Sequence, residues 1–214
     1  MRAVNINVYK YDELTNEAKE KVLSEQRNVN VRFNDWFELI IDAWKSSLEE
    51  FAFFAPRIYF SGFYSQGDGA CFECDSIYSD RLFEAVRAEI NTFSKEFQEV
   101  FKTQEVALFN FMENYVSFTI ETSIHRYCHE NTRYIDWDIH SDDEKAKYFE
   151  KFIDEIGEWL EEKRKTFSKE IYQQLEEEYE EQTSNDSVIY AVSSNEYEFL
   201  EDGRLVNFEF NILK

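Results

Sequence analysis

The sequence predicts an α+β fold, in which a mostly antiparallel sheet is covered by amphipathic helices, with a long acidic helical section near the C-terminus. Three observations predict it. Residues 57–75 are rich in glycine and have the pattern of a β-hairpin. Residues 116–121 and 135–139 alternate apolar and polar side chains, which is typical of strands. Longer stretches elsewhere repeat apolar residues at the i, i+3, i+4 and i+7 spacing of a helix.

The glycine-rich segment holds three of the chain's five glycines, Gly62, Gly67 and Gly69, within eight residues. Glycine is the residue that best tolerates a positive φ or a close approach of another group. Aromatic residues precede these glycines and the apolar residues 70–72 follow them, which suits two strands joined by a QGDG turn. We therefore expect a hairpin with a glycine turn.

Before this hairpin we expect one strand and two helices. Residues 4–8 alternate as a half-buried strand does. Thr15 is suited to cap a short helix whose apolar stripe reaches Val22. Asn34 is suited to begin a second helix, which we expect Pro56 to stop.

After the hairpin the apolar spacing predicts a helix from Ser79 or Asp80 to about Thr103. Residues 104–114 fit a strand or a helix equally well. After the two strands expected at 116–121 and 135–139, residues 141–182 have the apolar spacing of a helix. A single helix of this length would be unusually long.

We expect this long pattern to break near residues 165–168, because Ser168 is suited to cap a new helix. A short helix should begin at Ser184 or Asn185 and end in a left-handed cap at Asn195.

The last segment contains a DG dipeptide at 202–203 between alternating apolar residues, a strong signal for a β-hairpin. From these elements we expect an α+β core domain over residues 1–140. Residues 141–214 should form an acidic helical section with the C-terminal hairpin, packed on the core or forming one single domain with it.

Composition favours a folded, cytoplasmic protein. A chain of 214 residues buries roughly 70% of its unfolded surface, and 18% of its residues are aromatic. Three cysteines are too few for a disulfide scaffold and fit a reducing compartment. No apolar run has the length of a membrane span, and the first residues lack the apolar core of a signal peptide.

The chain is strongly acidic, with 45 acidic residues against 23 basic ones and a net charge of −22. The excess grows along the sequence, from −2 over residues 1–60 to −8 over 61–140 and −12 over 141–214. Such a field repels nucleic acids and anionic membranes and attracts basic surfaces. We therefore exclude direct nucleic-acid binding and membrane binding, and we expect a protein partner with a basic surface.

The sharpest functional candidate is a cluster of carboxylates near the C-terminus, because residues 170–203 contain eleven acids and no lysine or arginine. The candidate partner-binding residues are Glu170, Glu176, Glu177, Glu178, Glu180, Glu181 and Asp186. On a helix, the carboxylates of 170–182 follow one another about every 3.3 Å, close to the ~3.4 Å charge spacing of one DNA strand. The pattern indicates either a mimic of nucleic acid or a solvated helix face.

Cysteines and histidines invite a test for zinc. Cys71 and Cys74 in CFEC and His125, Cys128 and His129 in HRYCH have the residue types of a zinc site. Residues three apart in a strand point to opposite faces, however, and no second CxxC follows. We therefore expect no metal and no cofactor, and take the cysteines as small buried side chains.

A polar pocket is a further candidate. Gln66 and Asp68 in the glycine turn would meet His125 or His129 if the HRYCH segment lies beside the hairpin. A carboxylate and an imidazole together can perform acid–base chemistry. The alternative is a pair of side chains that only form structural hydrogen bonds.

Two segments carry a resemblance, VNINVYKYDELTNEAKEKVLSEQRNVNV (residues 4–31) and YFSGFYSQGDGACFECD (residues 59–75), of which SQGDGACF is the most specific part. They resemble a family of small acidic accessory proteins of tailed bacteriophages, some labelled antitoxin-like. The similarity covers about the first 140 residues and NEYEFLEDGR (195–204). It implies a phage protein acting in an infected bacterium and supplies no catalytic residue.

Together these observations predict a non-enzymatic phage inhibitor that binds a basic host protein, one that handles nucleic acids or serves in defence, through an acidic surface that mimics nucleic acid. Two alternatives remain. One is an antitoxin that neutralises a basic toxin. The other is a small enzyme or metal-binding protein that uses the glycine hairpin and the HRYCH segment.

Overall fold

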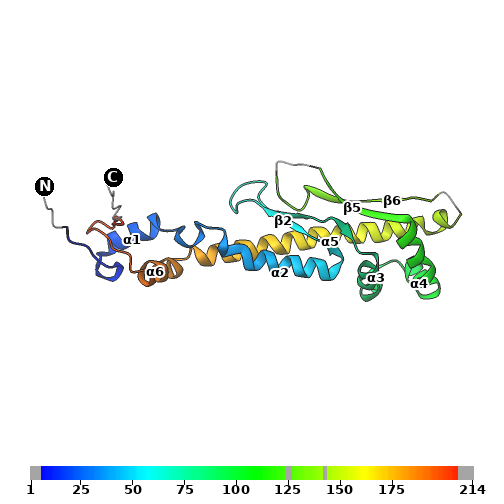
Figure 1. Cartoon of the computed structure of the whole chain (residues 1–214), viewed down its shortest axis with the longest axis horizontal. Coiled ribbons are helices and arrows are strands. Elements are labelled where there is room, and N and C mark those ends of the chain that lie inside the picture. Colours follow the sequence, from blue (N-terminus) through cyan, green and yellow to red (C-terminus); the bar gives the residue numbers. More distant parts are fainter. Residues whose placement is uncertain (1–5, 124–126, 142–143, 207–214) are drawn as a thin grey trace, which may run out of the picture. The chain divides into compact units, whose positions relative to one another are not determined.

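The computed structural model describes residues 6–123, 127–141 and 144–206, drawn in colour in Figure 1. The chain divides into two compact units. Unit 1 comprises residues 1–38 and 175–214, and unit 2 comprises residues 39–174. The division expected at residue 140 is a different one and stays a prediction.

The class predicted from the sequence is confirmed, because the fold is α+β and mostly helical, with a long helix near the C-terminus. The α-helices are α1 (Asn16–Glu25), α2 (Asp35–Phe51), α3 (Ser79–Ala88), α4 (Lys95–Tyr115), α5 (Glu144–Gln182) and α6 (Asn185–Ser194). The 3-10 turns are η1 (Tyr11–Glu13), η2 (Val29–Val31) and η3 (Ile90–Thr92). The strands are β1 (Phe53–Phe54), β2 (Arg57–Phe60), β3 (Ala70–Glu73), β4 (Ser76–Ile77), β5 (Val116–Thr122) and β6 (Arg133–Ile139).

The strands of the described chain form three separate antiparallel pairs, β1 with β4, β2 with β3 and β5 with β6. The expectation of a single larger sheet was therefore wrong. Strands of two and four residues, as in the first two pairs, offer few backbone groups to a third strand. The glycine hairpin is confirmed in its two strands, with Tyr59 opposite Cys71, and Gly67 has a φ of 96°. The connection is longer than the expected QGDG turn, because β2 ends at Phe60 and residues 61–69, with Phe63 and Tyr64, form the loop.

In unit 2 the β5–β6 hairpin lies along α5 (Figure 1). The Trp137 indole nitrogen donates to Asp154 at 2.9 Å, and the Ile135 backbone nitrogen donates to Glu161 at 2.9 Å. A Cβ atom at Gly157 would lie 2.6 Å from the Trp137 ring. A glycine in the middle of this helix therefore makes room for the indole.

The core of unit 2 is built from aromatic rings. Phe93, Phe97 and Phe101 stack in sequence, with ring centroids 4.5 and 5.9 Å apart, and Phe152 of α5 meets Phe97 edge-on at 5.9 Å. Phe97 and Phe152 are fully buried. The high aromatic content of the sequence is thus used to join α4 to α5.

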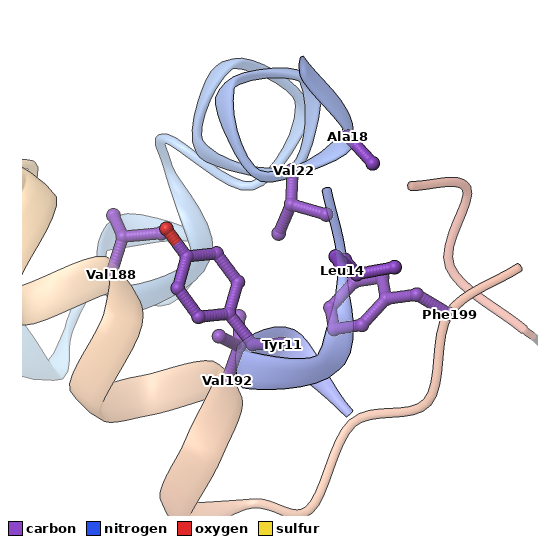
Figure 2. Packing of buried hydrophobic residues seen from close by; sticks show 7 residues of the cluster. All are labelled: Tyr11, Leu14, Ala18, Val22, Val188, Val192 and Phe199. Carbon is purple, nitrogen blue, oxygen red and sulfur yellow. The ribbon is translucent and has the colours of Figure 1, made fainter. Parts of the chain in front are cut away.

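Unit 1 has its own core, shown in Figure 2. It joins η1, α1 and α6 to Phe199, and its buried side chains are Tyr11, Leu14, Ala18, Val22, Val188, Val192 and Phe199. The backbones of Tyr9 and Phe199 exchange hydrogen bonds of 2.8 and 2.9 Å. Gly203, at a φ of 84°, passes so close to the Ala18 carbonyl that a Cβ would lie 2.6 Å from it.

The helix predicted from residue 79 to about 103 is two helices, α3 and α4. The Ser94 hydroxyl accepts a hydrogen bond from the Phe97 backbone nitrogen at 3.1 Å and so begins α4. Residues 104–114, which the sequence left open, continue α4 beyond a kink at Gln104.

The break predicted near Ser168 was wrong, because α5 continues without interruption for 39 residues. Ser168 is buried, and its hydroxyl donates to the Arg164 carbonyl at 2.9 Å. The serine therefore satisfies its hydroxyl inside the helix and does not cap a new one.

Other helix ends were predicted with mixed success. The caps at Thr15 and Ser184 are confirmed, since each hydroxyl accepts from a backbone nitrogen three residues later. The helix expected to reach Pro56 ends earlier because the chain extends into β1. Asn195 has a φ of −86°, and the left-handed residue is Glu196, at a φ of 53°.

The two ends of the chain are described in part. Of the strand expected at 4–8, residues 4–5 lie outside the described residues and 6–8 are irregular; only Tyr9 forms a bridge. The DG turn at 202–203 is confirmed, while residues 207–214 lie outside the described part. Of the helices that the structure describes, none combines the length and apolar character needed to cross a membrane.

Candidate functional site

The predicted binding carboxylates lie on α5 and α6. Five of them occupy the last two turns of α5 in unit 1, and Asp186 lies in the first turn of α6 in the same unit. Glu170 belongs to the part of α5 that lies in unit 2. We define the five glutamates of unit 1 as the acidic segment: Glu176, Glu177, Glu178, Glu180 and Glu181.

Three carboxylates of the acidic segment are exposed, those of Glu177, Glu180 and Glu181. They lie three and four residues apart, a spacing that places side chains on one face of a helix. Glu176 and Glu178 are half-buried, and Glu178 accepts a hydrogen bond from Gln182 at 2.8 Å. The outward array is therefore smaller than the sequence spacing suggested.

Within the described residues, no lysine or arginine forms an ion pair with Glu176, Glu178, Glu180 or Glu181. Glu181 instead accepts a hydrogen bond from the Ser187 hydroxyl at 3.4 Å. The negative charge of these four side chains is thus not neutralised within the described part of unit 1.

Two of the acidic residues that follow in the sequence, Glu198 and Asp202, form ion pairs within unit 1. Lys10 lies 3.6 Å from Glu198, and Lys21 lies 3.7 Å from Asp202. The Arg204 backbone N–H donates to Asp202 and is the main cause that lowers the pKa of that carboxyl. These pairs hold the C-terminal turn to the rest of unit 1, so we leave them out of the candidate site.

The end of α5 is fixed by hydrogen bonds to its last carbonyls. Arg27 donates to the Thr183 carbonyl at 2.8 Å, and the Asn30 amide donates to the Gln182 carbonyl at 3.0 Å. Trp36 meets Tyr179 edge-on at 5.7 Å. The acidic segment is therefore carried by an anchored helix end.

The position of the acidic segment is unfavourable for the helix itself. Helix C-termini carry a partial negative charge, and carboxylates there lose about 0.3–1 kcal/mol each relative to the favourable end. Glu180 and Glu181 lie in the last turn of α5. Helix stability thus does not account for placing glutamates there.

Residues 127–129 of the HRYCH segment lie beside the glycine turn in unit 2. A Cβ at Gly69 would lie 2.5 Å from the His129 Cβ atom, and one at Gly67 would lie 3.3 Å from the Tyr127 ring. The small glycines permit this approach. His125 lies outside the described residues.

No hydrogen bond joins the three predicted pocket residues that the structure describes, Gln66, Asp68 and His129, to one another. Asp68 accepts hydrogen bonds from the backbone nitrogens of Tyr64 and Ser65, at 3.1 and 2.7 Å, and so closes its own turn. The ring of His129 accepts from the Asn131 backbone nitrogen at 3.2 Å. Gln66 is exposed. Asp68 and His129 therefore each have a structural role in their own loop.

The thiols of Cys71 and Cys74 are protonated at neutral pH. Burial raises the pKa of Cys71 to about 11 and that of Cys74 to about 12. Among the residues that the structure describes, no three His, Cys, Asp or Glu side chains gather closely enough to hold a metal ion. The zinc interpretation therefore gains no support from the described residues.

With this geometry in place, the chain can be compared with known proteins. Residues 36–185 match the family described as Domain of unknown function (DUF8835). The chain belongs to this family. The DUF8835 match begins in α2 and ends at the first residue of α6, so it includes all of unit 2 and the acidic segment but not Asp186. Neither the curated proteins nor the solved structures searched gave a match.

The sequence interpretation missed a pocket in unit 2, lined by α4 beyond its kink and by the first turns of α5. The signal was present in residues 104–114. Once this stretch is helical, Gln104, Ala107, Phe111 and Asn114 fall on one face, which combines amides with an aromatic ring. Because the sequence did not decide between strand and helix for this stretch, it could not predict that these side chains share one face.

Proposed function

We propose that the protein is a phage-encoded, non-enzymatic inhibitor that acts in the cytoplasm of an infected bacterium. It binds a basic host protein that handles nucleic acids or serves in defence, and the acidic segment is its binding surface. The resemblance to small acidic phage proteins and the net charge of −22 support this proposal.

The observation that supports the proposal is the group of exposed glutamates in the last turns of α5, at a helix end that carries a partial negative charge. Within the described residues, Glu176, Glu178, Glu180 and Glu181 form no ion pair. A basic groove supplies the missing countercharge. Glu177 and Glu181 are about 6 Å apart along the helix, close to two charge steps of a DNA strand.

Exposed aromatic side chains in unit 1 add apolar contact area for a partner. Phe33 and Tyr190 are each 75% exposed. Aromatic residues are frequent among those that dominate binding energy at protein interfaces. Charge supplies steering and specificity, and such side chains supply contact.

We do not extend the proposal to an enzyme, because Asp68 and His129 are each engaged within their own loops. The partner is proposed to be a basic protein of the host. A basic toxin as partner is an outcome that the experiment below distinguishes.

The test is affinity capture from host lysate at low and high salt, with the full chain as bait. The variant E180K/E181K reverses two exposed charges of the acidic segment. The matched control E150K/E158K reverses two exposed charges on the same helix within unit 2.

We expect the wild type and the control to retain one basic protein at low salt, to release it at high salt, and to lose it when DNA is added. The variant E180K/E181K should retain none. Capture that ignores salt and DNA, or equal loss in both variants, contradicts the proposal. A captured partner that is toxic when expressed alone identifies an antitoxin instead.

A further inference from the structure

A pocket of about 530 Å³ lies in unit 2, between the second half of α4 and the first turns of α5. Its aromatic wall is continuous: Phe111 lies 5.4 Å from Tyr115 and 5.3 Å from Phe149, and Tyr148 lies 5.0 Å from Phe149. Tyr115 and Tyr148 are 42% and 43% exposed. The pocket therefore presents π-faces that a ligand can reach.

The hydrogen-bonding groups of the pocket are oriented by contacts within the protein. The Asn114 amide nitrogen donates to the Asn110 carbonyl at 2.7 Å, and the Gln104 amide nitrogen donates to the Tyr148 hydroxyl at 2.9 Å. Gln104 is held for this contact by the non-helical backbone of the kink, with φ −134° and ψ 23°.

These contacts leave acceptors available to a ligand. The carbonyl oxygens of Gln104 and Asn114 and the carboxylate of Glu144 accept no hydrogen bond from another described residue. No described residue that lines the pocket is positively charged. Because Glu144 is the only charged side chain among the described residues that line the pocket, a cation is attracted and an anion is repelled.

We propose that this pocket binds a guanidinium group. Guanidinium is planar, carries five N–H donors and stacks on aromatic rings, so one group can stack on Tyr148 and pair with Glu144, which lies one turn away on α5. An ammonium group has the charge but neither the planar face nor the fork of donors. The inference is independent of the proposed function, because the pocket lies in unit 2 and uses no glutamate of the acidic segment.

The guanidinium can come from a free small molecule or from an arginine side chain of a protein. Titration of the full chain with agmatine and with capped Gly-Arg-Gly distinguishes these sources by their relative affinity. The capped citrulline tripeptide, which keeps the shape without the charge, and the capped lysine tripeptide are the matched ligands. Calorimetry gives the affinities, and nitrogen-15 NMR of the Asn114 and Gln104 side-chain amides gives the location.

We expect a guanidinium ligand to bind at least about tenfold more tightly than the citrulline ligand and to shift both amide signals. Glu144→Gln should weaken binding about threefold, and E144Q/Y148L about tenfold or more. The control Glu158→Gln removes an exposed carboxylate elsewhere on α5 and should change nothing.

Equal affinities for the arginine and citrulline ligands would overturn the inference, as would equal effects of Glu144→Gln and Glu158→Gln. Because Tyr148 also packs on neighbouring rings, Glu144→Gln alone, at an exposed side chain, keeps the test valid if the double variant fails to fold. The variant E180K/E181K should bind guanidinium as the wild type does, so failure here and failure of the proposed function are distinguishable.

Discussion

Two parts of one helix use their charges in opposite ways. Along residues 151–169 of α5, in unit 2, each of the basic residues pairs with a carboxylate. The pairs are Lys151 with Glu96, Lys163 with Glu89, Arg164 with Glu161, Lys165 with Glu161 and Glu162, and Lys169 with Glu130. Along residues 175–182, in unit 1, there is no basic residue at all.

The comparison distinguishes charged side chains that stabilise the fold through ion pairs from charged side chains that are available to a binding partner. In unit 2 several carboxylates join α5 to other elements, as Glu161 does by accepting a hydrogen bond from the Ile135 backbone of β6, although others such as Glu150 and Glu158 are exposed. In unit 1 three of the glutamates, Glu177, Glu180 and Glu181, are exposed at a helix end that their charge does not stabilise. If the contrast holds, changes in the unit 2 part of α5 should alter stability far more than changes in the acidic segment.

The largest loss of stability should follow from replacing Arg164, which is 0% exposed. It donates to Glu161 twice and to the Glu130 carbonyl at 2.7 Å. Arg164→Met leaves a half-buried carboxylate and a carbonyl without this donor, and should lower the free energy of unfolding by about 3–5 kcal/mol.

Urea denaturation measures this change. The control Lys165→Met removes a more exposed partner of the same glutamate and should cost at most about 1 kcal/mol. Similar losses for both variants would mean that burial of the pair does not matter, and would break the contrast between the two parts of α5.

The unit 2 part of α5 also packs closely on another element, where Gly157 lies against the Trp137 ring. Gly157→Ala should destabilise the protein by about 1–3 kcal/mol, because the new methyl group would meet the Trp137 ring. Helix propensity alone predicts the opposite, a gain of roughly 1 kcal/mol. Thermal denaturation decides between them, and Trp137→Leu should relieve the loss.

Lowering the pH should reduce the stability of the folded protein through protonation of Glu161. Burial alone would raise the pKa of this carboxyl, but hydrogen bonds from Arg164 and the Ile135 backbone outweigh burial and lower it below the ordinary 4.5. The folded state then favours the ionised form. Glu161 thus stabilises the protein above about pH 4.5, and this contribution is lost as the pH falls through the lowered pKa.

Urea denaturation of the wild type and Glu161→Gln between pH 3 and 7 measures this contribution. The difference in stability between the two proteins should be largest near neutral pH and shrink below about pH 4.5. A difference that does not change with pH would show that the charge of Glu161 has no part in it.

The smallest effect on stability should come from the acidic segment. E180Q/E181Q removes two exposed charges that have no ion pair in the described residues, and should change the free energy of unfolding by no more than about 0.5 kcal/mol. A clear loss of stability would show that these glutamates hold the fold and are not reserved for a partner.

The sequence was informative where a local rule decides the structure. The glycine hairpin, the caps at Thr15 and Ser184 and the DG turn all depend on a few adjacent residues, and each is confirmed. The α+β class and a long acidic helical section near the C-terminus follow from periodicity and are confirmed as well, although the structure has one continuous helix where a break was expected.

The sequence failed where tertiary contacts decide. Ser168 has the residue type of a cap, but burial against neighbouring elements keeps α5 continuous. Gly157 gives no local signal for the Trp137 ring that it accommodates. Of the candidate site, the exposure of Glu180 and Glu181 was expected, whereas the half-burial of Glu176 required the structure.

The central claim is that the acidic segment is a binding surface for a basic protein. The most direct measurement is the dissociation constant of the captured partner at several salt concentrations, for the wild type, E180Q/E181Q and the control E150Q/E158Q. The account predicts strong salt dependence for the wild type and the control, with weaker binding and a shallower dependence for E180Q/E181Q. Identical curves for E180Q/E181Q and the wild type would contradict it.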